Sequence, residues 1–221
     1  MRRVLRENGL SITLLSLFLL FWVGQSVVGH QEHNSDQREH LQPEVAYFTY
    51  LQSAHFWEAT GENWESEFFQ MYGYVILTAF LYQKGSSESK TPGESEPVDR
   101  DPRRSKRRGA PWPVRRGGLV LKLYENSLSL AFLFFFLLSI TLHAVAGARV
   151  YNDEQAAHGQ AEQLSFLQYG GSSRFWFESL QNWQSEFLAI ASMVVLSIFL
   201  RQKGSPESKP VDSANGETGS G

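Results

Sequence analysis

The chain has 221 residues, of which 42% are hydrophobic and 19% are charged, and its formal net charge at pH 7 is −3. It has no cysteine, which excludes disulfides, thiolate metal sites and cysteine catalysis. The net charge alone is uninformative, because the basic residues are distributed very unevenly along the chain.

The sequence repeats itself. Residues 7–42 reappear as residues 125–160, and residues 56–90 reappear as residues 175–209, where 18 of 35 positions are identical. Internal repeats are a stronger guide to architecture than local propensity. We therefore expect one unit of about 100 residues that occurs twice, so that any interpretation of one copy must also fit the other.

The first element is the apolar run 10–28, which recurs as residues 128–146. Nineteen helical residues span about 28 Å, close to the thickness of the hydrocarbon core of a bilayer. A basic N-terminus and a Val-Val-Gly sequence flank the first run, which also fits a cleaved signal peptide. The second copy lies in the middle of the chain, where no signal peptide can be, so we favour retained transmembrane helices.

Polar residues follow both apolar runs. Asp36 precedes His40 by four residues, and Glu154 precedes His158 by the same spacing. On a helix each acid shares a face with its histidine, and such pairs stabilise a helix by themselves. Brought together from both copies, the four side chains also suit zinc or a similar metal, which is the alternative interpretation.

An aromatic-rich segment comes next in each copy. Trp57, Trp64 and Phe68 are spaced by seven and four residues, and the same trio recurs 119 residues later. This spacing places each trio on one face of a helix. We predict amphipathic helices near the outer leaflet, with ligand stacking as the alternative role. The expected membrane anchors are Trp57, Trp64, Trp176 and Trp183.

Each copy ends in a second apolar run, residues 68–82 and 187–200. These runs are long enough to cross a bilayer only if their helices begin near the last tryptophan before them. Glu67 and Glu186 could meet and bind a cation or share a proton, or each could simply occupy the positive N-terminal end of its helix. The candidate binding residues are Asn63, Ser66, Glu67, Asn182, Ser185 and Glu186.

The segments between and after the copies are polar. Residues 85–118 contain five of the eight prolines, so we predict a disordered linker, and we expect a loose tail at 204–221. The repeats then occupy residues 1–84 and 119–203. A basic run in the linker either marks its side of the membrane or contacts anionic lipid, whereas nucleic-acid binding is not expected. This run consists of Arg103, Arg104, Lys106, Arg107 and Arg108.

Basic residues set the orientation. Seventeen of the 20 lysines and arginines lie before the first apolar run, between the second and the third, or after the fourth, and three lie in the two remaining loops. Basic segments stay cytoplasmic during insertion. We therefore predict an all-α protein with four transmembrane helices, arranged as two parallel-repeat hairpins with amphipathic interfacial helices outside and both termini cytoplasmic.

No charged residue lies in the middle of an apolar run, which argues against a midplane proton relay. Phosphate loops, nucleophile elbows and HExxH motifs are missing from the sequence. We therefore expect no enzyme and no cofactor, but a non-enzymatic protein of the lipid bilayer, structural or a subunit of an unknown protein partner. The alternatives are a small channel or carrier with a cation- or proton-linked site at the outer mouth, and a metal-dependent extracytoplasmic enzyme using His40 and His158.

Three motifs carry a resemblance to a known family. They are residues 6–11 (RENGLS), 36–40 (DQREH) and 63–68 (NWESEF) with its repeat. At these motifs the chain resembles a family of uncharacterised bacterial multi-pass membrane proteins, known only as a domain of unknown function. The resemblance covers nearly all of the chain except the linker and the tail. It implies a bacterial plasma-membrane location, and it implies no catalytic or binding residue.

Overall fold

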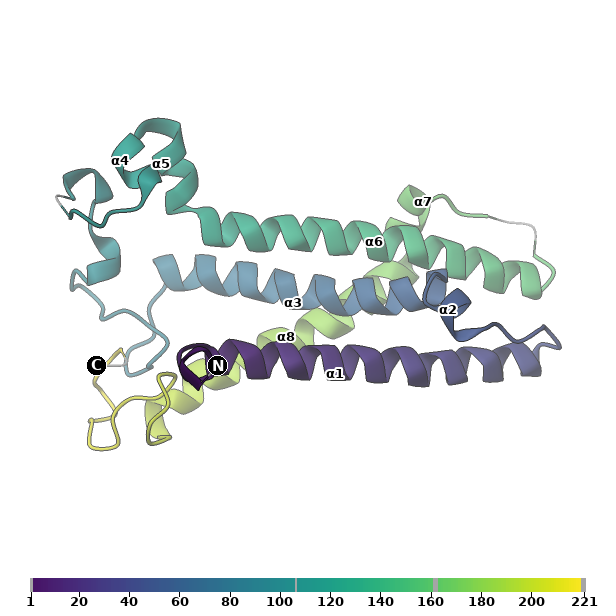
Figure 1. The fold of residues 1–221 in the computed structure, drawn as a ribbon, viewed down its shortest axis with the longest axis horizontal. Helices are drawn as coiled ribbons and strands as arrows, with labels where there is room; N and C mark the ends of the chain where they lie inside the picture. Colours follow the sequence, from purple (N-terminus) through teal and green to yellow (C-terminus); the bar gives the residue numbers. More distant parts are fainter. Residues whose placement is uncertain (1, 106, 161–162, 220–221) are drawn as a thin grey trace. The chain divides into compact units, whose positions relative to one another are not determined.

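The computed structural model describes residues 2–105, 107–160 and 163–219, and within these ranges the chain forms helices and no strand (Figure 1). The all-α prediction is therefore confirmed. The long helices are α1 (Arg2–Glu39), α3 (Ala54–Phe80), α6 (Ser127–Ala157) and α8 (Ser173–Phe199). The short ones are α2 (Tyr47–Tyr50), η1 (Pro97–Asp99), η2 (Pro102–Arg104), α4 (Trp112–Arg116), α5 (Gly118–Glu125) and α7 (Phe166–Gly170).

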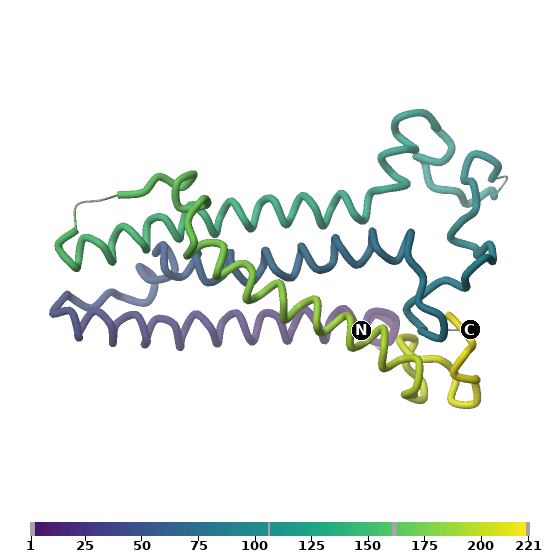
Figure 2. The backbone as a smooth tube through the Cα atoms, turned by 180° about the vertical axis from the view of Figure 1, so that it is seen from behind, coloured from purple at the N-terminus to yellow at the C-terminus, as the bar shows by residue number. Residues whose placement is uncertain are grey.

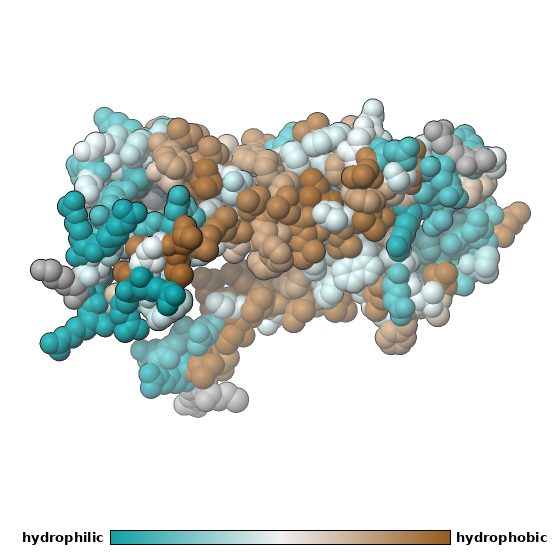
Figure 3. Space-filling model, turned by 90° about the horizontal axis from the view of Figure 1, so that it is seen from above, coloured by the Kyte–Doolittle hydropathy of each residue, from teal (hydrophilic) through white to brown (hydrophobic). Residues whose placement is uncertain are grey.

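Three helices in the described part of the chain are long and apolar enough to cross a membrane, namely Arg3–Glu39 of α1, α6 and α8. Helix α3 has the same length as α8, 27 residues, but it is not among the three. Its first half carries four glutamates, Glu58, Glu62, Glu65 and Glu67. Large apolar side chains are exposed along these three helices, and many are visible on the face in Figure 3, as expected for a surface that could meet lipid.

An asparagine lies shortly before each of the apolar runs 10–28 and 128–146. Asn8 has non-helical dihedral angles within α1 (φ −126°, ψ 17°), and Asn126 has similar ones between α5 and α6 (φ −114°, ψ 11°). Each side chain donates a hydrogen bond to the carbonyl four residues earlier, at 3.1 Å for Asn8 and 2.9 Å for Asn126. Such local bonds compete with the helical ladder. A bent entry therefore precedes both runs, and the teal trace shows the second of them (Figure 2).

The chain forms two compact units. Unit 1 consists of Met1–Glu62 and Thr141–Phe175, and unit 2 consists of Asn63–Ile140 and Trp176–Gly221. Each unit therefore contains residues of both sequence repeats, and the predicted linker, residues 85–118, belongs to unit 2.

Paired aromatic side chains form the core of unit 1. Tyr50 and Phe56 are 2% and 3% exposed, and their ring centroids lie 5.8 Å apart. Tyr169 and Phe175, which occupy the equivalent places in the second copy, are 0% and 3% exposed and also lie 5.8 Å apart. The same packing is thus built twice from sequence-equivalent residues.

A second aromatic cluster lies in unit 2. The ring centroid of Phe69 lies 4.4 Å from that of Trp183, 5.1 Å from that of Phe136 and 5.6 Å from that of Phe187. The indole nitrogen of Trp183 is buried in this cluster and has no hydrogen-bond partner. Packing between helices therefore holds this tryptophan.

The linker and the tail, which were predicted to be disordered, form specific hydrogen bonds in unit 2. The hydroxyl groups of Ser86 and Ser197 lie 2.9 Å apart, and the amide of Gly85 donates to Oγ1 of Thr218 at 2.9 Å. The buried ammonium group of Lys209 donates to three backbone carbonyls of the tail. The linker and the tail thus pack against each other and against the end of α8.

Candidate functional site

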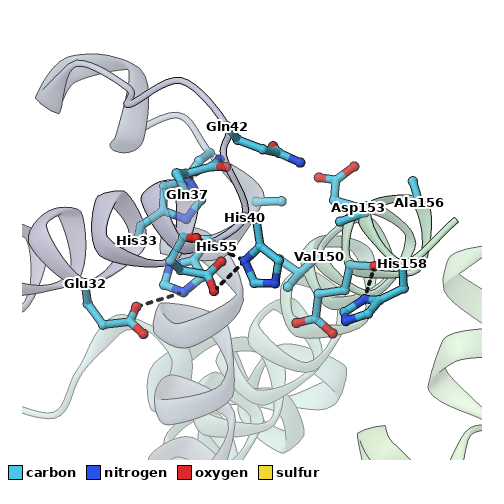
Figure 4. Close-up of a pocket in the computed structure, with 15 residues that line it drawn as sticks. Glu32, His33, Gln37, His40, Gln42, His55, Val150, Asp153, Ala156 and His158 are labelled. Carbon is cyan, nitrogen blue, oxygen red and sulfur yellow. Dashed lines mark hydrogen bonds and ion pairs between the residues drawn. The ribbon is translucent and has the colours of Figure 1, made fainter.

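Unit 1 contains a cavity of about 730 Å³ between the end of α1, the start of α3 and the end of α6 (Figure 4). Four of the six histidines of the chain line it, together with four carboxylates. A cavity with convergent titratable groups is the part of a protein most suited to binding a proton or a cation. These residues are His33, His40, His55, His158, Glu32, Asp36, Asp153 and Glu154.

Two asparagines fix the backbone beyond the helices that supply the cavity. Asn34 Oδ1 accepts from the Val45 amide at 2.9 Å, and its Nδ2 donates to the Val45 carbonyl at 3.1 Å. Asn152 makes the same two bonds to Leu164, at 2.8 and 2.9 Å. Each side chain therefore satisfies both polar groups of one loop residue, and this holds the loop against its helix.

His40 and His158 lie together in the cavity, with ring centroids 6.0 Å apart and ring planes at 70°. His40 Nδ1 lies 3.0 Å from the Asp36 carbonyl oxygen, and His158 Nδ1 lies 2.7 Å from the Glu154 carbonyl oxygen. A carbonyl oxygen only accepts, so Nδ1 is the donor in both rings, and Nε2 carries the lone pair when the ring is neutral. The structure thus brings together the two histidines singled out in the sequence.

The carboxylates of the predicted metal set are arranged differently. Asp36 Oδ1 lies 3.3 Å from His40 Nδ1, but both oxygens of Glu154 accept from the guanidinium group of Arg174. This bidentate pair directs the Glu154 carboxylate to Arg174. In the described ranges, no group of three or more metal-ligating side chains is arranged to hold an ion.

A second pair of histidines lines the same cavity. The ring centroids of His33 and His55 lie 5.0 Å apart, and His55 Nε2 lies 3.6 Å from a Glu32 oxygen. His55 Nδ1 lies 3.3 Å from the Tyr50 hydroxyl group. Burial, with a smaller contribution from Glu32, raises the pKa of Tyr50 to about 12.

Sequence reasoning did not single out Tyr50 or His55. Tyr50 recurs as Tyr169, and Ser53 recurs as Ser172, immediately before the repeat that starts at Phe56. Extending the repeat by six residues identifies the tyrosine. His55 is aligned with Arg174 and gives no identity signal.

The two candidate glutamates lie on adjacent helices of unit 2. The carbonyl of Glu186 accepts from Gln70 Nε2 at 2.8 Å, and Gln70 lies about one turn after Glu67 on α3. The negative charges of the Glu67 and Glu186 carboxylates repel each other. A paired carboxylate site stays a prediction.

The neighbouring polar candidates form hydrogen bonds within their own helices. Ser66 Oγ donates to the Asn63 carbonyl at 2.9 Å, and Ser185 Oγ donates to the Asn182 carbonyl at 2.8 Å. Asn182 Nδ2 donates to the Glu178 carbonyl at 3.1 Å. Local helix bonding therefore accounts for these contacts of the serines and asparagines.

The predicted anchors form aromatic contacts within their units. Trp57 lies 6.5 Å from Trp22 in unit 1, and Trp176 lies 6.0 Å from Trp183 in unit 2, measured between ring centroids. Trp64 is half-buried. Depth at the membrane surface stays a prediction for all four side chains.

Four of the five residues of the basic run in the linker lie within the described ranges. Arg103 and Arg104 belong to η2, and Arg104 Nε lies 3.6 Å from an Asp101 oxygen. Arg107 and Arg108 are exposed, whereas Lys106 lies outside the described residues. Contact of this run with anionic lipid stays a prediction.

Comparison with known proteins places the chain in a family. The family described as "Domain of unknown function (DUF6766)" matches residues 1–220. Neither the curated proteins nor the solved structures give a match. The expected membership in an uncharacterised family is confirmed, and the chain belongs to the DUF6766 family.

Proposed function

We propose that the chain is a non-enzymatic integral membrane protein with four spans in two hairpins. In this proposal its histidine-lined cavity lies on the outer side of a bacterial plasma membrane and binds a cation or a proton. The protein then acts as a small binding subunit, either alone or with a protein partner. The observation that carries the proposal is the contact between the ends of α1 and α6 in this cavity.

The contact supports the fourth span. Helices α1 and α6 each have the length and composition of a span, and their C-terminal ends meet within unit 1. Two spans whose ends meet must leave the membrane on the same side. The chain therefore has to cross back between Glu39 and Ser127, and α3, with 27 residues or about 40 Å of helix, is long enough to do so.

The charge distribution supports the orientation. The segments before the first apolar run, between the second and the third, and after the fourth carry 17 of the 20 basic side chains, so these segments are assigned to the cytoplasm. The cavity is formed by the opposite ends of the spans and is assigned to the outer side. Its imidazole and carboxylate groups suit a cation or a proton better than an apolar or anionic ligand.

Cysteine labelling tests this topology directly, because the chain has no cysteine of its own. We expect single variants Glu39→Cys and Gln160→Cys to react with a membrane-impermeant maleimide in intact cells. We expect Ser105→Cys and Ser213→Cys to react only after the cells are lysed. All four side chains lie outside the apolar runs, so the reagent can reach each of them once it is on the correct side.

The variant at residue 105 distinguishes four spans from three. If α3 does not cross, Ser105→Cys lies on the same side as Glu39→Cys, and Gln160→Cys lies on the other side. Labelling of residues 39 and 105 in intact cells, without labelling of residue 160, contradicts the proposal. Labelling after lysis serves as the control that each cysteine is reactive.

A further inference from the structure

We infer that His40 and His158 together bind one divalent transition-metal ion through their Nε2 atoms, so that the ion connects the two sequence repeats. The inference rests on the proposed function, because both histidines must lie on the same side of the membrane. It deepens that proposal by naming the ligand class and the atoms that hold it.

Both rings are prepared for coordination in the same way. In each, Nδ1 donates to the carbonyl of the residue four positions earlier, Asp36 or Glu154. A metal-binding histidine almost always donates its other ring N–H to a carbonyl or a carboxylate, which fixes the tautomer and the direction of the ring. Two sequence-equivalent histidines therefore present Nε2 as the coordinating atom without any change of tautomer.

The separation of the rings also fits a shared ion. A Zn–N bond of about 2.0–2.1 Å places an imidazole centroid about 3 Å from the metal. With that distance close to 3.2 Å, two such rings on one ion have centroids about 5.2 Å apart at a tetrahedral N–metal–N angle and about 6.4 Å apart when the two nitrogens lie opposite each other. The observed distance of 6.0 Å lies between these two values and corresponds to an angle of about 140°, so a tetrahedral ion requires the rings to move about 1 Å closer together.

The chemistry of the ligands selects the metal. Imidazole suits zinc, copper and nickel, whereas magnesium and calcium prefer carboxylate, carbonyl and water oxygens. Two protein ligands leave further positions of the ion for water, and the Asp153 carboxylate also lines the cavity (Figure 4). The site is therefore an open one, with exchangeable positions.

The other histidine pair of the cavity is less suited to this role. His55 already has Tyr50 at Nδ1 and Glu32 near Nε2. His33 Nε2 lies 3.4 Å from the side-chain nitrogen of Gln37. The Gln37 contact occupies Nε2 of His33 and has to be given up before that ring binds an ion, which makes His33 the matched control within the same cavity.

Copper(II) and zinc binding to the full chain in detergent tests the inference. Calorimetric titration with zinc chloride should show one saturable ion per chain. Copper(II) paramagnetic resonance should show hyperfine coupling to two imidazole nitrogens. Acidification should weaken binding of both ions, because protons compete for the imidazole nitrogens.

Histidine variants identify which imidazole nitrogens bind the metal ion. We expect His40→Gln and His158→Gln each to leave coupling to one nitrogen and to weaken zinc binding by more than about 10-fold, because the loss of a hydrogen-bond partner of a metal ligand alone costs about 10- to 100-fold. His33→Gln should change neither measurement, and circular dichroism should show the same helix content in all variants. The inference is overturned if no saturable ion binds, or if His33→Gln removes a nitrogen while His40→Gln does not.

Its failure can be separated from that of the proposed function. Labelling that places residues 39 and 160 on opposite sides overturns both. Labelling of both residues from outside, without metal binding, overturns the metal site alone.

Discussion

Replacing Gly61 by alanine should destabilise the protein by about 1–3 kcal/mol, because it forces helix α3 away from helix α6 within unit 1. A Cβ atom at residue 61 would lie 2.8 Å from the backbone nitrogen of His143 and 3.2 Å from its Cα atom. These are backbone atoms, so no rotamer change relieves the contact. Small residues such as glycine allow two helices to approach this closely.

The neighbourhood of Gly61 cannot easily give way. His143 is fully buried, and its ring stacks on Phe175 with centroids 4.6 Å apart. Thermal unfolding in detergent, followed by circular dichroism, measures the effect. A protein of this size loses about 2–4 °C in midpoint for each kcal/mol.

Gly24 provides a matched control, since it lies within α1 and a Cβ atom there would meet nothing within 4 Å. Gly24→Ala should be neutral or should stabilise the helix by up to about 1 kcal/mol, because alanine is the better helix former. Equal losses of stability in both variants would show that Gly61 is not a packing constraint.

The repeat made part of the site predictable from the sequence. Residues 118 positions apart, such as His40 and His158, were expected to have equivalent local structure, and each does donate Nδ1–H to the carbonyl four residues before it. Helical periodicity alone gives this local geometry. The 6.0 Å contact between the two rings depends on how α1 packs against α6, and no pattern within one helix specifies that packing.

The departures from the predicted site arise from partners far along the chain. In the alternative interpretation Glu154 was a candidate metal ligand because it lies four residues before His158, but its carboxylate accepts from Arg174, 20 residues later. His55 contributes to the cavity by contacts with His33 and Glu32 on another helix. A lone histidine at the start of an amphipathic helix carries no signal for such contacts.

Some features of the helices follow from nearby residues and others from contacts with distant helices. The aromatic segment that contains Trp57 and the following apolar run form one continuous helix, α3, so the predicted amphipathic part runs directly into the second run. The bends at Asn8 and Asn126 follow from a local side-chain bond and could have been predicted from the asparagines. The aromatic cluster around Phe69 could not have been predicted in this way, because its side chains come from three helices, α3, α6 and α8.

Replacing Asn152 by alanine should destabilise the protein by about 1–3 kcal/mol and should release the loop at Leu164. The side chain supplies both the acceptor for the Leu164 amide and a donor for its carbonyl. Hydrogen–deuterium exchange should show fast exchange of the Leu164 amide in the variant, together with a lower thermal midpoint.

The other copy of the repeat makes this prediction sharper. His30 Nε2 lies 2.8 Å from the Val45 carbonyl, so Asn34→Ala leaves that carbonyl one partner, whereas Ala148, the counterpart of His30, offers none to Leu164. Asn152→Ala should therefore loosen its loop more than Asn34→Ala loosens the loop at Val45. Asn8→Ala, which removes one exposed bond to the Val4 carbonyl, is the control and should change the stability by less than about 1 kcal/mol. Protection of the Leu164 amide that survives in Asn152→Ala would show that the loop is held by other contacts.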